Sequence, residues 1–341
     1  MKKKVSNGVK GVSELRQDLV TGDWVVIATG RAKRPGDFLK QKRAPFTQPK
    51  ATCPFEKLLP KALAVYAADG QHREKDWWVQ AVSNKYPAFN KGICAVVNNV
   101  GPYQWAEGAG FHEVVITREH DRPFARMTRE EVSLVLRVYQ ERFCAMEADG
   151  CVKYISIFHN HGRLSGASIA HPHSQIIAIP VVPPDVVTSL RGATEYFKKE
   201  HACAHCVIIK YELQKRQRIV YENKNFIALA PYASRTAFEM RIFPKAHRAH
   251  FEQITSDERD GLADTLRATL CKLAKGLGNP DYNFFIHTAP TKDHDAFALY
   301  HWHIEILPKT AIWAGFEIGT GIEISTIAPE TAAAFLQKVK V

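Results

Sequence analysis

The sequence lacks any long apolar run, and this absence excludes a large class of proteins. Among its 341 residues, no apolar stretch approaches the roughly 20 residues that a membrane-spanning helix needs. The basic start of the chain, with lysines at positions 2–4, is not followed by the apolar core of a secretory signal. We therefore expect neither a membrane partner nor export. Hydrophobic residues at 45% and charged residues at 24% also exclude a disordered or fibrous chain.

Cysteine is scarce and odd in number. Seven cysteines without an export signal argue against a disulfide framework and favour a reducing cytoplasm. Four of them stand singly among apolar residues and are expected to be core thiols: Cys94, Cys144, Cys151 and Cys271. The others occur in Cys203-Ala-His-Cys206 and in Cys53-Pro-Phe-Glu56, with the spacing by which two side chains of one tight turn reach one metal ion.

Acidic residues are outnumbered by basic ones. The chain has 46 Lys and Arg against 35 Asp and Glu, a formal net charge of +11, which favours anionic partners. The excess is concentrated between Arg31 and Lys50, where seven basic residues accompany a single acid, Asp37. This segment is interpreted either as a solvated loop or as one that grips phosphate. We expect no nucleic-acid partner, because no binding motif is recognised and no aromatic residues are interleaved as stacking platforms.

The chain contains an internal repeat. Residues 111–120 and 238–247 both begin with Phe and end with His, and in both copies a Phe and then a Thr follow at intervals of four residues. A helix-like segment, a strand-like run and a His-x-His sequence come next in both copies. The match covers residues 53–180 and 203–308.

The order of elements in each copy predicts an α+β fold. Thr128 and Thr255 precede acid-rich stretches typical of helix starts, and apolar residues follow at helical spacing. We expect two tandem histidine-triad-like domains, residues 1–190 and 191–341, each a mostly antiparallel sheet packed against a long helix. Residues 181–200 are expected to connect them.

The repeat also predicts two metal sites. In the second copy, two thiolates and two imidazoles form a set typical of a closed structural zinc site. In the first copy, a carboxylate replaces one thiolate, and because carboxylate oxygen is also a zinc ligand, we expect zinc there too, bound differently. The sets are Cys203, Cys206, His247 and His301 in the second copy, and Cys53, Glu56, His120 and His171 in the first.

The His-Pro-His segment of the first copy predicts a nucleophile. Alternation along a strand places His171, His173 and Gln175 on one face. With His171 on the metal, His173 remains an unliganded imidazole, which attacks phosphorus near pH 7 because its ordinary pKa is about 6.5. Gln175 is expected to hydrogen-bond a nonbridging phosphate oxygen of a covalent intermediate. The second copy has Glu305 in place of this amide, so we expect one chemical centre per chain.

A glycine-rich turn precedes this segment. It runs from Asn160 and contains Gly166, and its backbone N–H groups and the hydroxyls of Ser165 and Ser168 can hold phosphate oxygens as charge develops at phosphorus.

Residues 160–175, ending in Gly-x-Ser-x-x-His-Pro-His-x-Gln, resemble the galactose-1-phosphate uridylyltransferase family of the histidine-triad superfamily. The resemblance spans residues 13–337, with further similar segments in the right order. These segments are Leu15-Arg-x-Asp-x-x-Thr-Gly-x-Trp24, Gly30-Arg-x-x-Arg-Pro35, Asn84-Lys-Tyr-Pro-Ala88, Gly110-Phe-His-Glu-Val-Val-Ile116 and Gly315-Phe-Glu-Ile-Gly-Thr-Gly321.

The resemblance implies ping-pong nucleotidyl transfer. In the family, the second His of His-Pro-His attacks the α-phosphorus of a nucleotide sugar, sugar 1-phosphate leaves, and another sugar 1-phosphate takes the nucleotide. That histidine is His173 here, and the first His of the motif, His171, is a metal ligand. The resemblance further implies phosphate contacts for Asn160, Ser168 and Gln175, phosphate or sugar-phosphate gripping for Arg31 and Arg34, a nucleotide contact for Asn84 and a hexose contact for Glu317.

The leading interpretation is a uridylyltransferase acting on UDP-glucose and galactose 1-phosphate. One alternative is an ADP-sugar or dinucleoside-polyphosphate phosphorylase using the same histidine, and another is a non-catalytic zinc-stabilised nucleotide or nucleic-acid binder. Family members are commonly dimers that share active-site residues, so we expect a homodimer.

The sequence departs from the family at two positions. Glu56 stands where the family has Cys, and Glu323 stands where enterobacterial-type enzymes have a Gln that reads the hexose. A carboxylate only accepts hydrogen bonds. Residues 315–321 look more like the branch that includes plant ADP-glucose phosphorylases.

Overall fold

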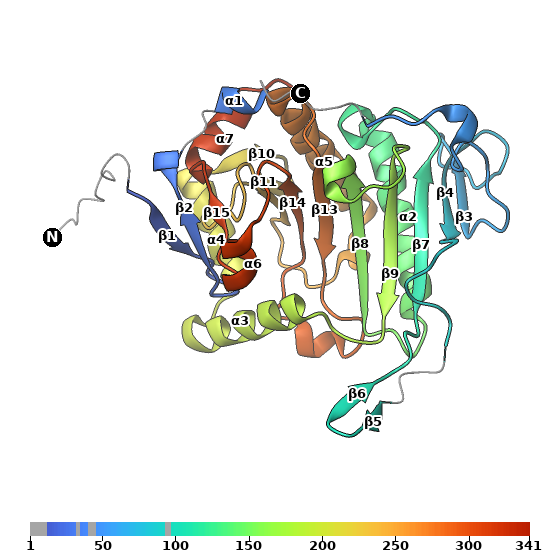
Figure 1. Ribbon diagram of the computed structural model, residues 1–341, viewed down its shortest axis with the longest axis horizontal. Helices are drawn as coiled ribbons and strands as arrows, with labels where there is room; N and C mark the ends of the chain where they lie inside the picture. Colours follow the sequence, from blue (N-terminus) through green and yellow to red (C-terminus); the bar gives the residue numbers. More distant parts are fainter. Residues whose placement is uncertain (1–11, 32–34, 40–45, 93–96) are drawn as a thin grey trace.

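The computed structural model describes residues 12–31, 35–39, 46–92 and 97–341, and it confirms the α+β class (Figure 1). The strands are β1 Glu14–Gln17, β2 Trp24–Ile27, β3 Ala64–Ala67, β4 Trp77–Ser83, β5 Asn98–Val100, β6 Tyr103–Trp105, β7 Phe111–Thr117, β8 Tyr154–His161, β9 His173–Ile179, β10 Ile219–Glu222, β11 Phe226–Leu229, β12 Met240–Pro244, β13 Tyr282–His287, β14 His303–Pro308 and β15 Ile324–Ser325. The α-helices are α1 Pro35–Leu39, α2 Arg129–Glu147, α3 Pro184–Glu200, α4 Ala204–Lys215, α5 Ser256–Leu277, α6 Gly315–Thr320 and α7 Pro329–Gln337.

The repeat appears in the order of the strands. Ten strands form one sheet in the order β10-β11-β12-β14-β13-β8-β9-β7-β4-β3. Counted inward from each edge, the first copy supplies β3, β4, β7, β9 and β8, and the second supplies β10, β11, β12, β14 and β13. The two halves meet where β8 and β13 pair antiparallel, with Asn160 opposite Asn283. The copies are therefore joined edge to edge in one sheet, as Figure 1 shows.

Two long helices cover one face of this sheet. Both have the N-caps expected from the sequence: Thr128 and Thr255 each form a capping box, with Glu131 and Glu258 respectively. α2 and α5 contact each other, and one hydrophobic core, drawn from both halves, lies between them and the sheet. It includes Ile176 of β9 and Ile304 of β14.

The opposite face carries the polar residues of interest. Because side chains alternate along a strand, the burial of Ile176 against the helices places its neighbour Gln175 on the other face. On that side lie a small sheet of β1, β2 and β15 and the helices α3 and α4 (Figure 1). The expected connector between the copies is largely α3, which Pro184 begins and the left-handed His201 ends.

Three of the four expected core thiols lie within the described residues. Cys271 is buried, as predicted. The prediction was wrong for Cys144, which is exposed because it lies on the solvent side of α2. It was also wrong for Cys151, which is disulfide-bonded. Cys94 lies outside the described residues. Among the described helices, none combines the length and the apolar character that crossing a bilayer would require.

Candidate functional site

The structure brings each predicted metal set together. The ligand atoms within each set all lie within 4.8 Å of one another. The first cluster forms where β7 ends and β9 begins, and the second where β12 ends and β14 begins. The first contains Cys53, Glu56, His120 and His171, and the second contains Cys203, Cys206, His247 and His301.

In the first cluster, Glu56 takes the position of a thiolate. His171 Nδ1 lies 3.6 Å from Cys53 Sγ and 3.4 Å from Glu56 Oε1, and His120 Nδ1 contacts the same carboxylate. His171 is fully buried and His120 nearly so. One thiol, one carboxylate and two imidazoles therefore converge on one point, a donor set that a zinc ion accepts.

In the second cluster, both ligands from the turn are cysteines. Cys203 is the N-cap of α4 and Cys206 lies in its first turn. Cys206 Sγ lies 3.4 Å from His247 Nδ1 and 3.6 Å from His301 Nδ1, and Cys203 Sγ lies 3.9 Å from His301 Nδ1. The α4 start therefore delivers both sulfur atoms to the two imidazoles.

All four imidazoles have the same orientation. Because a carbonyl oxygen only accepts hydrogen bonds, each Nε2 carries the ring proton and donates a hydrogen bond to a backbone carbonyl. The Nδ1 lone pair is thereby left facing the cluster. Such an outer hydrogen bond usually fixes the tautomer and the ring of a metal-ligating histidine. The pairs are His120 with Gln48 at 2.6 Å, His171 with Thr117 at 2.5 Å, His247 with Ala298 at 2.7 Å and His301 with Pro244 at 3.0 Å.

His173 has the geometry of a nucleophile. It opens β9 opposite Ile116, and its Nδ1 lies 2.8 Å from the carbonyl oxygen of His171. Nδ1 therefore donates, and the lone pair is on Nε2. Burial lowers the pKa of His173 below its ordinary value, so the imidazole is neutral near pH 7.

A hydrogen-bond chain fixes the amide of Gln175. The Ala88 N–H donates to His112 Nδ1 at 3.1 Å, so the neutral His112 ring carries its proton on Nε2. That Nε2 lies 2.8 Å from Gln175 Oε1 and donates to it, which leaves the Gln175 NH₂ group to donate to a phosphate oxygen. Asn84 Nδ2 also lies 3.0 Å from His112 Nε2, but both atoms carry hydrogen in this arrangement, so they form no hydrogen bond with each other.

Asn160 is held from the second half of the sheet. Its side-chain oxygen accepts a hydrogen bond from Asn283 Nδ2 at 2.7 Å, and the same Asn283 amide donates to the Ser165 carbonyl at 2.8 Å. The Asn160 NH₂ group is thereby left as a donor. By the register of β8 and β9, Asn160 lies on the same face as His173 and Gln175.

The glycine-rich turn is a short 3₁₀-helix, η4 (Arg163–Ser165), between two glycines with positive φ. A side chain at Gly162 would place its Cβ 2.2 Å from the Asp281 carboxylate, which accepts a hydrogen bond from Leu164 N at 2.6 Å. Ser165 does not expose its hydroxyl, contrary to expectation, because it donates to the Gly162 carbonyl at 2.6 Å. Ser168 is exposed.

Sequence reasoning missed His112 and Asn283, although both orient predicted site residues. His112 lies within a motif that carried the family resemblance, and its strand register places it next to Gln175. Asn283 lies in the second copy and reaches the first only through the pairing of β8 and β13, which no local pattern reveals.

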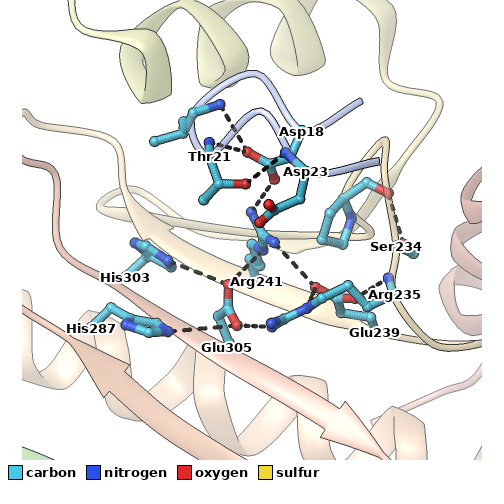
Figure 2. Close-up of polar contacts among 12 residues, drawn as sticks. Asp18, Thr21, Asp23, Ser234, Arg235, Glu239, Arg241, His287, His303 and Glu305 are labelled. Atoms are coloured by element: carbon cyan, nitrogen blue, oxygen red, sulfur yellow. Dashed lines mark hydrogen bonds and ion pairs between the residues drawn. The ribbon is translucent and has the colours of Figure 1, made fainter. Parts of the chain in front are cut away.

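The second half has a histidine in the same position but different surroundings. His303 Nδ1 lies 3.1 Å from the His301 carbonyl, and its Nε2 faces Glu305 at 3.7 Å. Figure 2 shows Glu305 between Arg235 and Arg241, and Arg241 Nε lies 3.0 Å from its Oε1. A fixed carboxylate beside His303 repels phosphate, so this geometry disfavours nucleophilic chemistry there.

Arg241 is the centre of this buried charge cluster. Its guanidinium also lies 2.9 Å from Asp18 and 3.4 Å from Glu239, as Figure 2 shows for Asp18. Burial opposes ionisation of Asp18 and Glu305, but the arginine charges hold the pKa of both below the ordinary range. Burial raises the pKa of Glu239 and lowers that of His303 to about 3.

A cavity of about 390 Å³ adjoins the cluster, lined in part by Trp313 and Glu323. It lies on the same sheet face as His173 but in the other half. Burial raises the pKa of Glu323.

Of the remaining predicted substrate contacts, Arg31 and Glu317 lie within the described residues. Arg31 ends the 3₁₀-helix η1 (Thr29–Arg31), and Arg34 lies outside the described residues. Glu317 lies on α6, where its carboxylate accepts a hydrogen bond from Ala314 N at 3.0 Å. In Figure 1, α6 lies near β2 and β15, while β14, β13 and β8 separate it from β9.

Comparison with family models gives two matches. The model of the galactose-1-phosphate uridyl transferase N-terminal domain matches residues 5–183. A domain of unknown function, DUF4921, matches residues 103–339.

Relatives of known activity match along almost the whole chain. The sequence is 33% identical to the ADP-glucose phosphorylase of Arabidopsis thaliana, over 96% of this chain and 93% of that protein. It is 27% identical to the galactose-1-phosphate uridylyltransferase of Thermotoga maritima, over 96% and 99% respectively. The crystal structure of the Arabidopsis thaliana ADP-glucose phosphorylase with bound ADP-glucose superposes with a TM-score of 0.81 and 29% identity, covering 97% of this chain and all of that one.

Proposed function

Because the chain belongs to the galactose-1-phosphate uridylyltransferase family and is an enzyme of the nucleotidyltransferase type, we propose that it transfers a nucleotidyl group through a covalent intermediate on His173. The observation that carries the proposal is the hydrogen bond from His173 Nδ1 to the His171 carbonyl at 2.8 Å. It fixes the ring and leaves the Nε2 lone pair for attack on phosphorus.

The reaction takes place in two displacements. His173 Nε2 forms a bond to the α-phosphorus of a nucleotide sugar, the bond from that phosphorus to the bridging oxygen breaks, and sugar 1-phosphate leaves. An oxygen of an acceptor phosphate then attacks the phosphorus and releases the histidine. The first step exchanges one P–O bond for one P–N bond and the second step reverses that exchange, so His173 is restored after every cycle.

Neighbouring donors stabilise the charge that develops at phosphorus. The NH₂ groups of Gln175 and Asn160 are both left available by their fixed partners, and Ser168 is exposed in the turn that follows Asn160. The Gly166 N–H is not available, because it donates to the Arg163 carbonyl at 3.1 Å. Loss of one such donor typically lowers turnover by about 10²- to 10³-fold. Asn84, which lies beside His112, is proposed to contact the nucleotide.

The two ligand clusters are proposed to hold zinc. Two features support zinc in both: imidazoles already fixed through Nε2 and a donor set of sulfur and nitrogen, to which Glu56 adds oxygen in the first cluster. His171, held by such an ion, would in turn position His173 two residues further along the chain. The free thiols of the two clusters suit a reducing compartment such as the cytoplasm, whereas the disulfide of Cys151 does not.

The substitution Glu56→Ala tests the first zinc site. It is expected to lower the zinc content by one equivalent per chain, because only three ligands remain, whereas Glu56→Cys is expected to retain the ion. Zinc is measured by plasma mass spectrometry after dialysis. An Ala variant that holds as much zinc as the wild type would show that this cluster does not bind it.

Inorganic phosphate is the acceptor that we favour. The identity of 33% to an ADP-glucose phosphorylase exceeds the 27% to a uridylyltransferase, at equal coverage of this chain. Position 323 is Glu, whose carboxyl group cannot offer a hexose the two N–H donors of an amide. With phosphate as acceptor, the products of ADP-glucose are ADP and glucose 1-phosphate.

A substrate panel tests the acceptor. The enzyme is incubated with ADP-glucose and phosphate, or with UDP-glucose and galactose 1-phosphate, and the nucleotides are separated by chromatography. We expect phosphate-dependent release of ADP, at a rate well above the formation of UDP-galactose. Formation of UDP-galactose without phosphorolysis of ADP-glucose would reverse this assignment.

Transfer from UDP-glucose to galactose 1-phosphate remains the second candidate. It is supported by the family model matched over residues 5–183. A dinucleoside polyphosphate in the same panel tests the remaining phosphorylase alternative.

A homodimer is proposed on geometric grounds. Among the described residues, no hydrogen bond or ion pair joins Glu317 to His173, and α6 lies over the other half of the sheet (Figure 1). A hexose contact from Glu317 to a substrate on His173 would therefore come from a second copy of the chain.

A further inference from the structure

A third group of potential metal ligands lies away from both duplicated clusters. His250 precedes the 3₁₀-helix η5 (Phe251–Gln253), Glu252 lies within it, and His294 begins the 3₁₀-helix η6 (His294–Phe297). The ligand atoms of these three residues all lie within 4.8 Å of one another. Neither the proposed nucleotidyl transfer nor the duplicated metal sets use this group.

Two of its members are buried, and their polar side-chain atoms lack hydrogen-bond partners. The side chains of His250 and Glu252 are 5% and 4% exposed, and His250 Nδ1 lies 3.3 Å from Glu252 Oε1. Neither ring nitrogen of His250 and neither carboxylate oxygen of Glu252 has a hydrogen-bond partner. Buried polar atoms are nearly always satisfied, so four orphaned ones at one point indicate a missing partner.

The third member is already oriented as a metal ligand would be. His294 Nε2 lies 2.9 Å from Glu147 Oε1, so it donates there and its Nδ1 lone pair remains free. The rings of His294 and His250 stack with centroids 4.1 Å apart. Glu147 is the last residue of α2, and the partial negative charge at that helix end also favours a cation.

No side-chain cation of the described chain fills this role. Glu147 and Glu252 make ion pairs only with the two histidines, within the residues that the structure describes. The nearby Lys292 ammonium donates instead to the backbone carbonyls of Glu147 and Asp149.

The cluster of His287, His303 and Glu305 provides the contrast. Its ligand atoms are equally close, but its carboxylate is paired with Arg235 and Arg241 (Figure 2). A cation there would have to displace two guanidinium groups, whereas Glu252 has none to displace.

We propose that His250, Glu252 and His294 bind a divalent transition-metal ion, with Glu147 as the outer partner that orients His294. Two imidazole nitrogens and carboxylate oxygen suit zinc, cobalt, nickel or manganese, whereas calcium and magnesium prefer oxygen alone. The ion would satisfy the orphaned atoms of His250 and Glu252 at once.

The site would join the two halves of the molecule. Glu147 ends the long helix of the first copy, and the three ligands come from two connections of the second copy. Gln140 of α2 already donates to the carbonyls of Glu252 and Ile254 across the same seam. The first-copy counterparts of His250 and Glu252 are Pro123 and Ala125, so the repeat alone does not account for this group.

The test compares metal content between the wild type and His294→Gln. Both proteins are equilibrated with excess zinc, freed of unbound metal and analysed by plasma mass spectrometry. We expect the wild type to hold one more equivalent per chain than the variant, whatever the occupancy of the other clusters. His294 is 40% exposed, so its substitution is not expected to prevent folding.

Two further variants complete the design. Glu252→Gln, nearly isosteric, is expected to lose the same equivalent, and the exposed His72→Gln is the matched control that keeps it. In the cobalt-loaded proteins, the difference between the wild-type and variant absorption spectra should contain no thiolate-to-cobalt charge-transfer band. This separates the site from the cysteine-containing clusters. Equal metal content in wild type and His294→Gln would overturn the proposal, and so would a lost equivalent that carries a thiolate band.

Discussion

Replacing His173 by asparagine is expected to lower turnover by about 10⁴- to 10⁶-fold, the scale seen when a covalent nucleophile is removed. An asparagine amide has no basic lone pair on nitrogen, so it cannot form the P–N bond that Nε2 forms. Asn160 and Gln175 keep their partners in the variant, so substrate affinity should change much less than turnover. Steady-state rates with ADP-glucose and phosphate measure both quantities.

The same substitution at His161 is the matched control. His161 lies on β8, next to Asn160, but alternation turns it to the opposite sheet face, where its Nε2 contacts Asn279 at 3.1 Å. His161→Asn should keep turnover within about tenfold of the wild type. A His173→Asn enzyme with comparable turnover would remove His173 from the reaction.

Replacing Arg241 by methionine is expected to lower the free energy of unfolding by about 3–5 kcal/mol, as when one partner of a buried ion pair is removed. The side chain is only 11% exposed. Its loss removes the ion-pair partner of Asp18 and leaves Glu239 and Glu305 with Arg235 alone. Urea unfolding at pH 7 measures the difference between the two proteins.

The pH dependence of that difference has a defined sign. The folded-state pKa values of Asp18 and Glu305 lie below their ordinary values. The stability that these carboxylates supply is therefore fully present above about pH 4 and lost as the pH falls through the folded-state values. The difference between wild type and variant should shrink below about pH 4.

Arg129→Met is the surface comparison. Arg129 and Glu130 pair with side chains 57% and 67% exposed, and such pairs contribute about 0–1 kcal/mol. If Arg241→Met proved no more destabilising than Arg129→Met, the buried cluster in Figure 2 would not contribute to the stability of the fold.

Much of the fold could be predicted because the same sequence pattern occurs twice in the chain. Thr128 and Thr255, each followed three residues later by Glu, marked the starts of α2 and α5, and both cap as expected. The pattern of each copy identified strands and helix, but not that β8 and β13 would pair into one sheet. That pairing depends on contacts between distant segments.

The ligand clusters were predictable for the same reason. Spacing within Cys203–Cys206 and within His301–His303 is local, and the repeat supplied the partners. The orientation of Gln175 by His112, by contrast, follows from strand register. The group around His250 belongs to neither copy's pattern, so only the folded chain shows it.

The covalent intermediate on His173 is tested most directly by the mass of the intact protein after incubation with ADP-glucose or UDP-glucose in the absence of any acceptor. We predict a single nucleotidyl adduct per chain, located at His173 by peptide mapping, absent in His173→Asn and removed on addition of the acceptor phosphate. No adduct from either nucleotide sugar, or an adduct that persists in His173→Asn, would contradict it.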